Sequence, residues 1–144
     1  MARSEGLWLD CDVLLDWLSG RQPWVVDIAE LIRRSVAGEW SLWISPLTLA
    51  NVHYIYRKHD GSTKSLAAIR NLTLIANLAT MDSTHVLEAL ASERLDFEDE
   101  LQIACASCVP GLVAIITRNL PDYGNSPIPA MTARAWLDAH PAVA

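Results

Sequence analysis

The chain has 144 residues, 51% of them hydrophobic, and a formal net charge of −6 with an isoelectric point near 5.0. This length and composition predict a single folded domain over residues 1–144 and argue against a disordered chain, and the negative charge argues against a broad basic surface for nucleic acid. The apolar stretches are too short to span a membrane, the N-terminus lacks a signal-like pattern and three cysteines need no disulfides, so we expect a cytoplasmic protein with reduced thiols.

Four short apolar runs have the length of buried parallel strands, with helical spacing between them. The expected strands are residues 7–10, 41–45, 78–81 and 113–117. The expected helices are residues 12–18, 24–37, 46–60, 62–76 and 83–91, the last of these capped by Ser83 or Thr84, followed by a long helix from about Asp96. A proline-rich loop over residues 121–129 leads to an edge strand near Ala130 and a helix around Trp136. This alternation predicts a three-layer α/β/α sandwich with a central parallel sheet of four to five strands.

Two aspartates follow the first expected strand. Asp10 stands at its carboxyl end, where open parallel sheets bind ligands, and Asp12 begins the next helix. Both are equally explained as a turn aspartate and a helix cap, because a carboxylate readily accepts hydrogen bonds from free backbone amides. No glycine loop of the nucleotide-binding kind is present, so we expect no nucleotide cofactor.

Carboxylates are crowded again before the long helix, where Asp96-Phe97-Glu98-Asp99-Glu100 holds four of them in five residues. Asp96 and Asp99 have the spacing of one helix face. A solvated first turn, favoured by the helix dipole, accounts for such a cluster, and so does a bound cation that relieves the repulsion.

A polar loop follows the fourth expected strand, with Thr117, Arg118, Asn119 and Asp122 in sequence. It reads either as a surface turn or as part of a site, in which Arg118 contacts a phosphate. Because the carboxyl ends of parallel strands meet at one edge, we expect this loop, Asp10 and the acidic helix start to converge. Such a carboxylate edge suits Mg²⁺, which prefers oxygen ligands.

Four ordered blocks resemble the PIN-domain family, which includes the toxin ribonucleases of VapBC toxin–antitoxin pairs. The blocks are Leu9-Asp10-Cys11-Asp12-Val13-Leu14-Leu15-Asp16, Ile44-Ser45-Pro46-Leu47-Thr48-Leu49-Ala50-Asn51, Asp96-Phe97-Glu98-Asp99, and Ile116-Thr117-Arg118-Asn119 with Asp122-Tyr123. The resemblance implies a Mg²⁺- or Mn²⁺-dependent endoribonuclease. It implies that Asp10, Asp99 and Asp122 or Asn119 form the metal site, with Asp96 beside them, and that Thr117, Arg118 and Asp12 lie near the substrate.

The chain departs from the family pattern at Asn51, where many members have glutamate. An amide can ligate a metal or orient a water but brings no charge. We therefore expect either a lower metal affinity or a substitute carboxylate from a neighbour such as Glu98, Asp96 or Asp12, and the resemblance is to a subgroup of the family that shares this asparagine. The resemblance also implies an antitoxin partner, and the six tryptophans are compatible with a homodimer interface as well as with core packing.

Three functions remain open from sequence. The first is the metal-dependent ribonuclease, the second a non-catalytic or weakly catalytic RNA- or protein-binding module on the same fold, and the third a phosphatase-like hydrolase. Cys105-Ala106-Ser107-Cys108 has the spacing of a redox or zinc motif but lacks a second ligand pair, so we expect two buried helix cysteines. The four histidines show no ligand or triad spacing.

Overall fold

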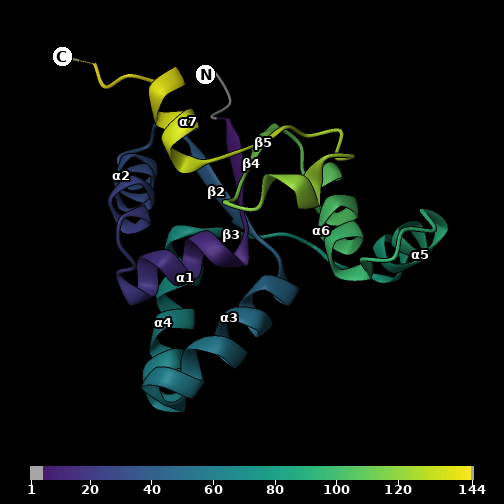
Figure 1. Cartoon of the computed structure of the whole chain (residues 1–144), viewed down its shortest axis with the longest axis horizontal. Coiled ribbons are helices and arrows are strands. Elements are labelled where there is room, and N and C mark those ends of the chain that lie inside the picture. The colour runs from purple at the N-terminus through teal and green to yellow at the C-terminus, as the bar shows by residue number, and fades with distance from the viewer. Residues whose placement is uncertain (1–4, 144) are drawn as a thin grey trace.

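The computed structural model describes residues 5–143, which form a five-stranded parallel sheet flanked by helices (Figure 1). The strands are β1 (Gly6–Leu9), β2 (Ser41–Ile44), β3 (Asn77–Leu78), β4 (Leu112–Ile116) and β5 (Ala130–Met131). Their spatial order is β3-β2-β1-β4-β5, so the connections run in opposite directions on the two sides of β1. The crevice at such a reversal, beyond the carboxyl ends of β1 and β4, is where doubly wound sheets bind ligands. The predicted fold class is confirmed.

Seven α-helices and one short 3₁₀ turn connect the strands within the described residues. They are α1 (Cys11–Ser19), α2 (Trp24–Val36), α3 (Pro46–Asp60), α4 (Ser62–Ile75), α5 (Ser83–Ala91), α6 (Phe97–Ser107), the 3₁₀ turn Leu120–Tyr123 and α7 (Ala133–Ala139). Local signals set several of these ends. Ser45 accepts a hydrogen bond from the Thr48 amide at 2.9 Å, with proline at the first position of α3. Gly20 ends α1 with φ of 64°, a conformation that glycine adopts without strain.

The sheet has a hydrophobic core on each face. Leu7, Leu9 and Ile116 pack on one face against α1, α2, α3, α4 and α7. Trp8 and Ile115, the alternate residues of the same strands, pack on the other face against α6. This alternation is what a strand buried on both faces requires, and it makes the three layers of the domain. In Figure 1, α5 and α6 lie to the right of the sheet and the other helices lie to its left and below.

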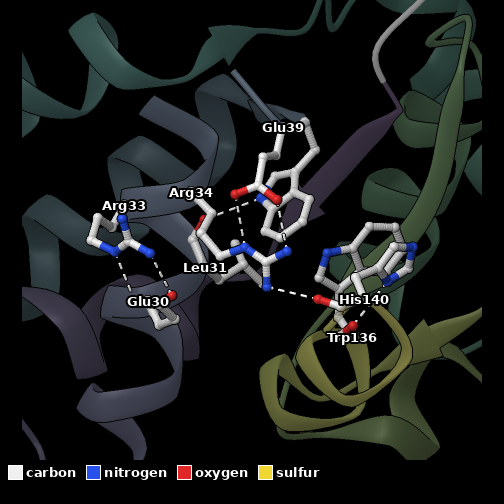
Figure 2. A network of polar contacts seen from close by, with 8 residues as sticks. Glu30, Leu31, Arg33, Arg34, Glu39, Trp136 and His140 are labelled. Carbon is white, nitrogen blue, oxygen red and sulfur yellow. Dashed lines mark hydrogen bonds and ion pairs between the residues drawn. The ribbon is translucent and has the colours of Figure 1, made fainter. Parts of the chain in front are cut away.

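A polar and aromatic network fixes the C-terminal helix to α2 (Figure 2). The buried guanidinium of Arg34 donates two hydrogen bonds to Glu39 and one to the carbonyl of His140, at 2.7–2.9 Å. The rings of Trp136 and His140 stack with centroids 3.8 Å apart, and Trp40 packs edge-on against both. Charge-assisted bonds of this kind hold the chain end in one geometry.

Three details differ from the sequence predictions. The strand expected over residues 78–81 is β3, which is shorter and begins earlier, because the chain leaves the sheet edge after Leu78. Asp82, rather than Ser83 or Thr84, caps α5 by accepting a hydrogen bond from the Thr84 amide. Cys105 is buried as predicted but Cys108 is exposed, since it stands at the end of α6. Among the described residues, no helix has the length and apolarity needed to span a membrane.

Candidate active site

Asp10 is fixed at the point where β1 passes into α1. Its amide continues the β1–β4 ladder by donating to the Ile116 carbonyl at 3.1 Å. One carboxylate oxygen accepts from the Cys11 amide at 2.8 Å, and the other accepts from the Thr117 hydroxyl at 2.8 Å. Thr117 is fully buried at the end of β4. Two adjacent strand ends therefore hold this carboxylate in one orientation.

Asp12 ties the loop after β4 to the first turn of α1. Its carboxylate accepts hydrogen bonds from the amides of Val13, at 2.7 Å, and Arg118, at 2.9 Å. The Thr117 hydroxyl also lies 3.4 Å from the same carboxylate, so Asp10 and Asp12 share a neighbour. The Asp12 carboxylate thus binds backbone amides, and it positions the loop after β4 beside Asp10.

The 3₁₀ turn carries the next two predicted residues. The Asn119 side-chain amide donates to the Asp122 carboxylate, and the Asn119 backbone amide donates to the Thr117 hydroxyl at 3.0 Å. Both Asn119 and Asp122 are exposed, whereas Tyr123 is buried. The turn therefore presents an amide and a carboxylate to solvent above a buried phenol.

The acidic start of α6 faces this turn. Asp96 caps α6 by accepting from the Asp99 amide at 3.1 Å, and Asp99 is half-buried on the first turn of the helix. The expected helix start is confirmed to within one residue, but Asp96 is a cap rather than a helical residue, which directs part of its carboxylate toward the backbone.

Asn51 on α3 contacts α6 directly. Its side-chain amide donates to the Glu98 carboxylate at 2.6 Å. A buried polar network lies one turn deeper, where Gln102 of α6 accepts from the Ser45 hydroxyl and donates to that of Thr48, both at 2.9 Å. Every member of that network has a partner, so it fixes the register of α3 against α6 and with it the position of Asn51 opposite Glu98.

Electrostatics show that carboxylates from three parts of the chain form one cluster. Burial raises the pKa of Asp10, and the charge of Asp122 raises it further, against hydrogen bonds that lower it. Burial also raises the pKa of Asp99 to about 7, with further contributions from Asp122, Asp96 and Asp10. A like charge raises a pKa in this way only from nearby, so Asp122 lies in the neighbourhood of both Asp10 and Asp99.

This cluster has the chemistry of a divalent cation site. Its donors are carboxylate oxygens, the ligands that Mg²⁺ and Mn²⁺ prefer, and the raised pKa values of Asp10 and Asp99 reflect burial first and then repulsion from Asp122, both of which a cation would offset. In the part of the chain that the structure describes, no three His, Cys, Asp or Glu side chains are placed so as to hold a metal ion together. The residues fit the ion in chemical type, because carboxylates are the oxygen ligands that Mg²⁺ and Mn²⁺ prefer.

The guanidinium of Arg118 points away from the cluster. It donates two hydrogen bonds to the buried carboxylate of Asp16, at 2.7 and 3.0 Å, and lies 3.9 Å from the ring centroid of Trp24. The main-chain amide of Arg118 stays beside Asp12, but the predicted phosphate contact would have to compete with Asp16. A surface cavity of about 710 Å³ lies between α2 and the residues around α7, and none of the predicted metal residues lines it.

Two residues at this edge received no role from the sequence. Tyr123 is buried, and its phenol lies close enough to the charges of Asp10 and Asp99 for them to raise its pKa, which burial raises most. Asp16 is four residues after Asp12, a spacing that places both on one face of α1 and would have indicated its contact with the β4 loop.

Known proteins were compared with the chain in sequence and in structure. A family model described as PIN domain matches residues 7–120. No curated protein sequence matches the chain. Similar solved structures include DNA-bound VapBC from Salmonella typhimurium, with 17% identity and a TM-score of 0.65 over 90% of this chain and 98% of that one. A toxin–antitoxin complex from Klebsiella pneumoniae has 20% identity and a TM-score of 0.65 over 88% and 97%. VapBC-1 from nontypeable Haemophilus influenzae has 16% identity and a TM-score of 0.66 over 90% and 98%.

Proposed function

Because the chain belongs to the PIN domain family, we propose that it is a metal-dependent endoribonuclease that hydrolyses RNA phosphodiester bonds. One observation supports the proposal most: Asp10 stands at the edge where parallel sheets bind ligands, and the charge of Asp122, from a distant part of the chain, acts on the pKa of both Asp10 and Asp99. Mutually repelling carboxylates are stable together when a cation is bound between them. The proposed ion is Mg²⁺ or Mn²⁺.

The proposed roles follow the contacts at the edge. Asp10, Asp99 and Asp122 would hold the ion, with Asp96 beside them. Thr117 fixes Asp10 through its hydroxyl, and Asn119 fixes Asp122 through its amide. Once bound, a divalent ion polarises the scissile phosphate and lowers the pKa of a water molecule.

Asn51 and Glu98 form the proposed substitute for a carboxylate on α3. The amide of Asn51 carries no charge, but its hydrogen bond to Glu98 places a carboxylate at the same point of the edge. On this proposal, Glu98→Gln lowers Mn²⁺ affinity, whereas Asn51→Asp leaves it unchanged or raises it.

The test is a Mn²⁺ titration by calorimetry together with an RNA cleavage assay. Asp10→Asn and Asp99→Asn should each lower Mn²⁺ affinity by about tenfold or more and abolish cleavage. Glu30→Gln is the matched control, because Glu30 is an exposed acid paired with Arg33 on α2. Equal Mn²⁺ binding in all three variants and the wild type, or cleavage that persists in EDTA, would refute the proposal.

A binding module on the same fold is the second candidate. Two features favour it: residues 5–143 contain no ready-made group of three metal-binding side chains, and α3 carries an amide where a carboxylate is the family norm. This function predicts RNA or protein binding that is insensitive to Mn²⁺, with no cleavage at any metal concentration. The calorimetric and cleavage assays above separate the two candidates.

We further propose that the protein is a toxin that acts in the cytoplasm beside an antitoxin. The similar structures named above are VapBC or toxin–antitoxin complexes, which supports such a partner. A homodimer is proposed as well, since α5 exposes Leu87 and Leu90. Growth arrest on expression that Asp10→Asn removes, and a dimer mass by light scattering that Leu87→Lys reduces, are the expected results.

A further inference from the structure

A second cavity opens beside the carboxylate edge, between α1, α2 and the start of α7. Its volume is about 310 Å³, at the lower end of the range for small-molecule sites. Asp16, Trp24, Asp27, Arg118, Thr132 and Arg134 contribute to its lining. Asp16 lies one helical turn along α1 from Asp12, so the cavity begins about 6 Å further along the helix from the edge.

Arg118 connects the cavity with the edge. Its main-chain amide donates to Asp12, whose neighbour Thr117 holds Asp10, while its side chain forms part of the cavity wall. The guanidinium stacks on Trp24 with 3.9 Å to the ring centroid. Trp24 still has 44% of its surface exposed, although large aromatic side chains are usually more buried. A partly open aromatic and guanidinium surface therefore begins at the residue that follows Thr117, which holds Asp10.

The charges of the cavity are paired with one another. Arg118 donates to Asp16 at 2.7 and 3.0 Å, and Arg134 donates to Asp27 at 3.0 Å and to Asp138 at 3.1 Å. A phosphate entering the cavity would have to displace these carboxylates and would face their negative charge. A neutral planar group can stack on Trp24 and use the carboxylate and guanidinium edges as acceptor and donor without breaking either pair.

We propose that this cavity binds an unpaired nucleobase of the RNA strand held at the carboxylate edge, by stacking on Trp24 and Arg118. The inference rests on the proposed function, since the strand reaches the cavity from that edge. Stacking on aromatic side chains and arginine planes is a usual way in which proteins hold the bases of single-stranded RNA. The stacking contact itself is made with an uncharged base, so it does not depend on a basic surface in a chain of net charge −6.

The experiment measures binding of short single-stranded RNA by fluorescence anisotropy at saturating Mn²⁺, with Asp10→Asn in every protein so that the RNA stays intact while the ion is still supplied. Trp24→Ala should weaken binding about tenfold or more, and Trp24→Phe should retain most of the affinity because it keeps a ring. Tyr54→Ala is the matched control. Tyr54 is 54% exposed on α3 and stacks with Lys58 at 3.9 Å, but it lies outside the cavity lining. Thermal melts confirm that each variant is folded.

Several outcomes would overturn the inference. These are equal affinity of Trp24→Ala and its parent, an equal loss in Tyr54→Ala, and no measurable RNA binding by the parent. RNA affinity unchanged by Trp24→Ala, with loss of an antitoxin complex, would assign the cavity to a protein partner instead. Failure of the proposed function gives a different result. A protein that cleaves no RNA but loses RNA affinity in Trp24→Ala would contradict the proposed function and support the inference. In an active protein with Asp10 intact, Trp24→Ala should raise KM about tenfold and leave kcat unchanged.

Discussion

The ion pair between Asp16 and Arg118 allows a quantitative test of the structure around the site. The carboxylate of Asp16 is 1% exposed and the side chain of Arg118 is 31% exposed. Arg118→Met leaves a buried carboxylate whose remaining cation, Arg21, is 3.8 Å away and 41% exposed. Loss of one partner of a buried pair costs about 3–5 kcal/mol, and Arg21 reduces this, so we expect a loss of about 3 kcal/mol in the free energy of unfolding.

The opposite variant should cost less. Asp16→Leu leaves the guanidinium of Arg118 without its carboxylate, but that group retains access to water and its stacking on Trp24. We expect a loss of about 2 kcal/mol. The double variant leaves neither charge buried alone, so its loss should be about 1–2 kcal/mol, well below the sum of the two single losses.

Urea unfolding followed by circular dichroism measures these free energies, with similar slopes required for all variants. A loss of about 3 kcal/mol corresponds to a fall in Tm on the order of 6–12 °C for a domain of this size. Arg33→Met is the control, since Arg33 forms the same bidentate contact with Glu30 on an exposed face and should leave stability unchanged. Additive losses in the double variant would refute the argument, because they would mean that the two charges do not compensate each other.

Three further predictions concern the candidate site. Thr117→Val should lower the free energy of unfolding, measured in urea, by about 1–2 kcal/mol because the hydrogen bond to Asp10 is lost. It should also lower Mn²⁺ affinity about tenfold in calorimetry, because Asp10 is no longer held in place. Thr117→Ser keeps the hydroxyl and should behave like the wild type. The pKa of Asp99 is raised to about 7 in the folded protein, so the folded state holds this proton more tightly than the unfolded state does. In EDTA, the free energy of unfolding should therefore fall as the pH rises from about 4 through 7. Melts across this range should show the decline, and Asp99→Asn should flatten it. Gln102→Leu removes the acceptor of the Ser45 hydroxyl and should lower the free energy of unfolding in urea by about 1–3 kcal/mol. An unchanged urea midpoint would show that this network does not stabilise the fold.

Most of the fold was predictable because local signals agree with the global arrangement. Ser45-Pro46 marks the start of α3 and Gly20 marks the end of α1. Both signals act on the backbone of adjacent residues, so they can be read from a few residues of sequence. The strand β3 was misplaced because it pairs through only two residues at the sheet edge, where no apolar pattern is needed. Cys108 was expected to be buried because its spacing from Cys105 suits one helix face, but the helix ends there.

The sequence predicted which strand ends carry the site, but it did not predict which side chains contact one another there. Asp10 follows β1 and Thr117 follows β4, so their proximity is a consequence of strand order. The bond between Asn51 and Glu98 depends on how α3 packs against α6, which sequence spacing does not encode. Arg118 illustrates the same limit, because only the packing of α1 against β4 reveals that its partner is Asp16 rather than solvent.

The pairing of charges indicates why the proposed metal and the proposed stacking surface would act together. Binding of nucleic acid by counterion release needs cations that can contact phosphates, yet Arg118 and Arg134 are already paired with carboxylates of their own chain. The carboxylate edge itself repels a phosphate until its charge is neutralised. A bound cation would therefore have to attract the backbone at Asp10, while the proposed contact at Trp24 would hold a neighbouring base. Each contact alone would be weak, but a strand that spans both gains the second without a further loss of translational freedom, so on this proposal an acidic protein holds RNA through two adjacent contacts.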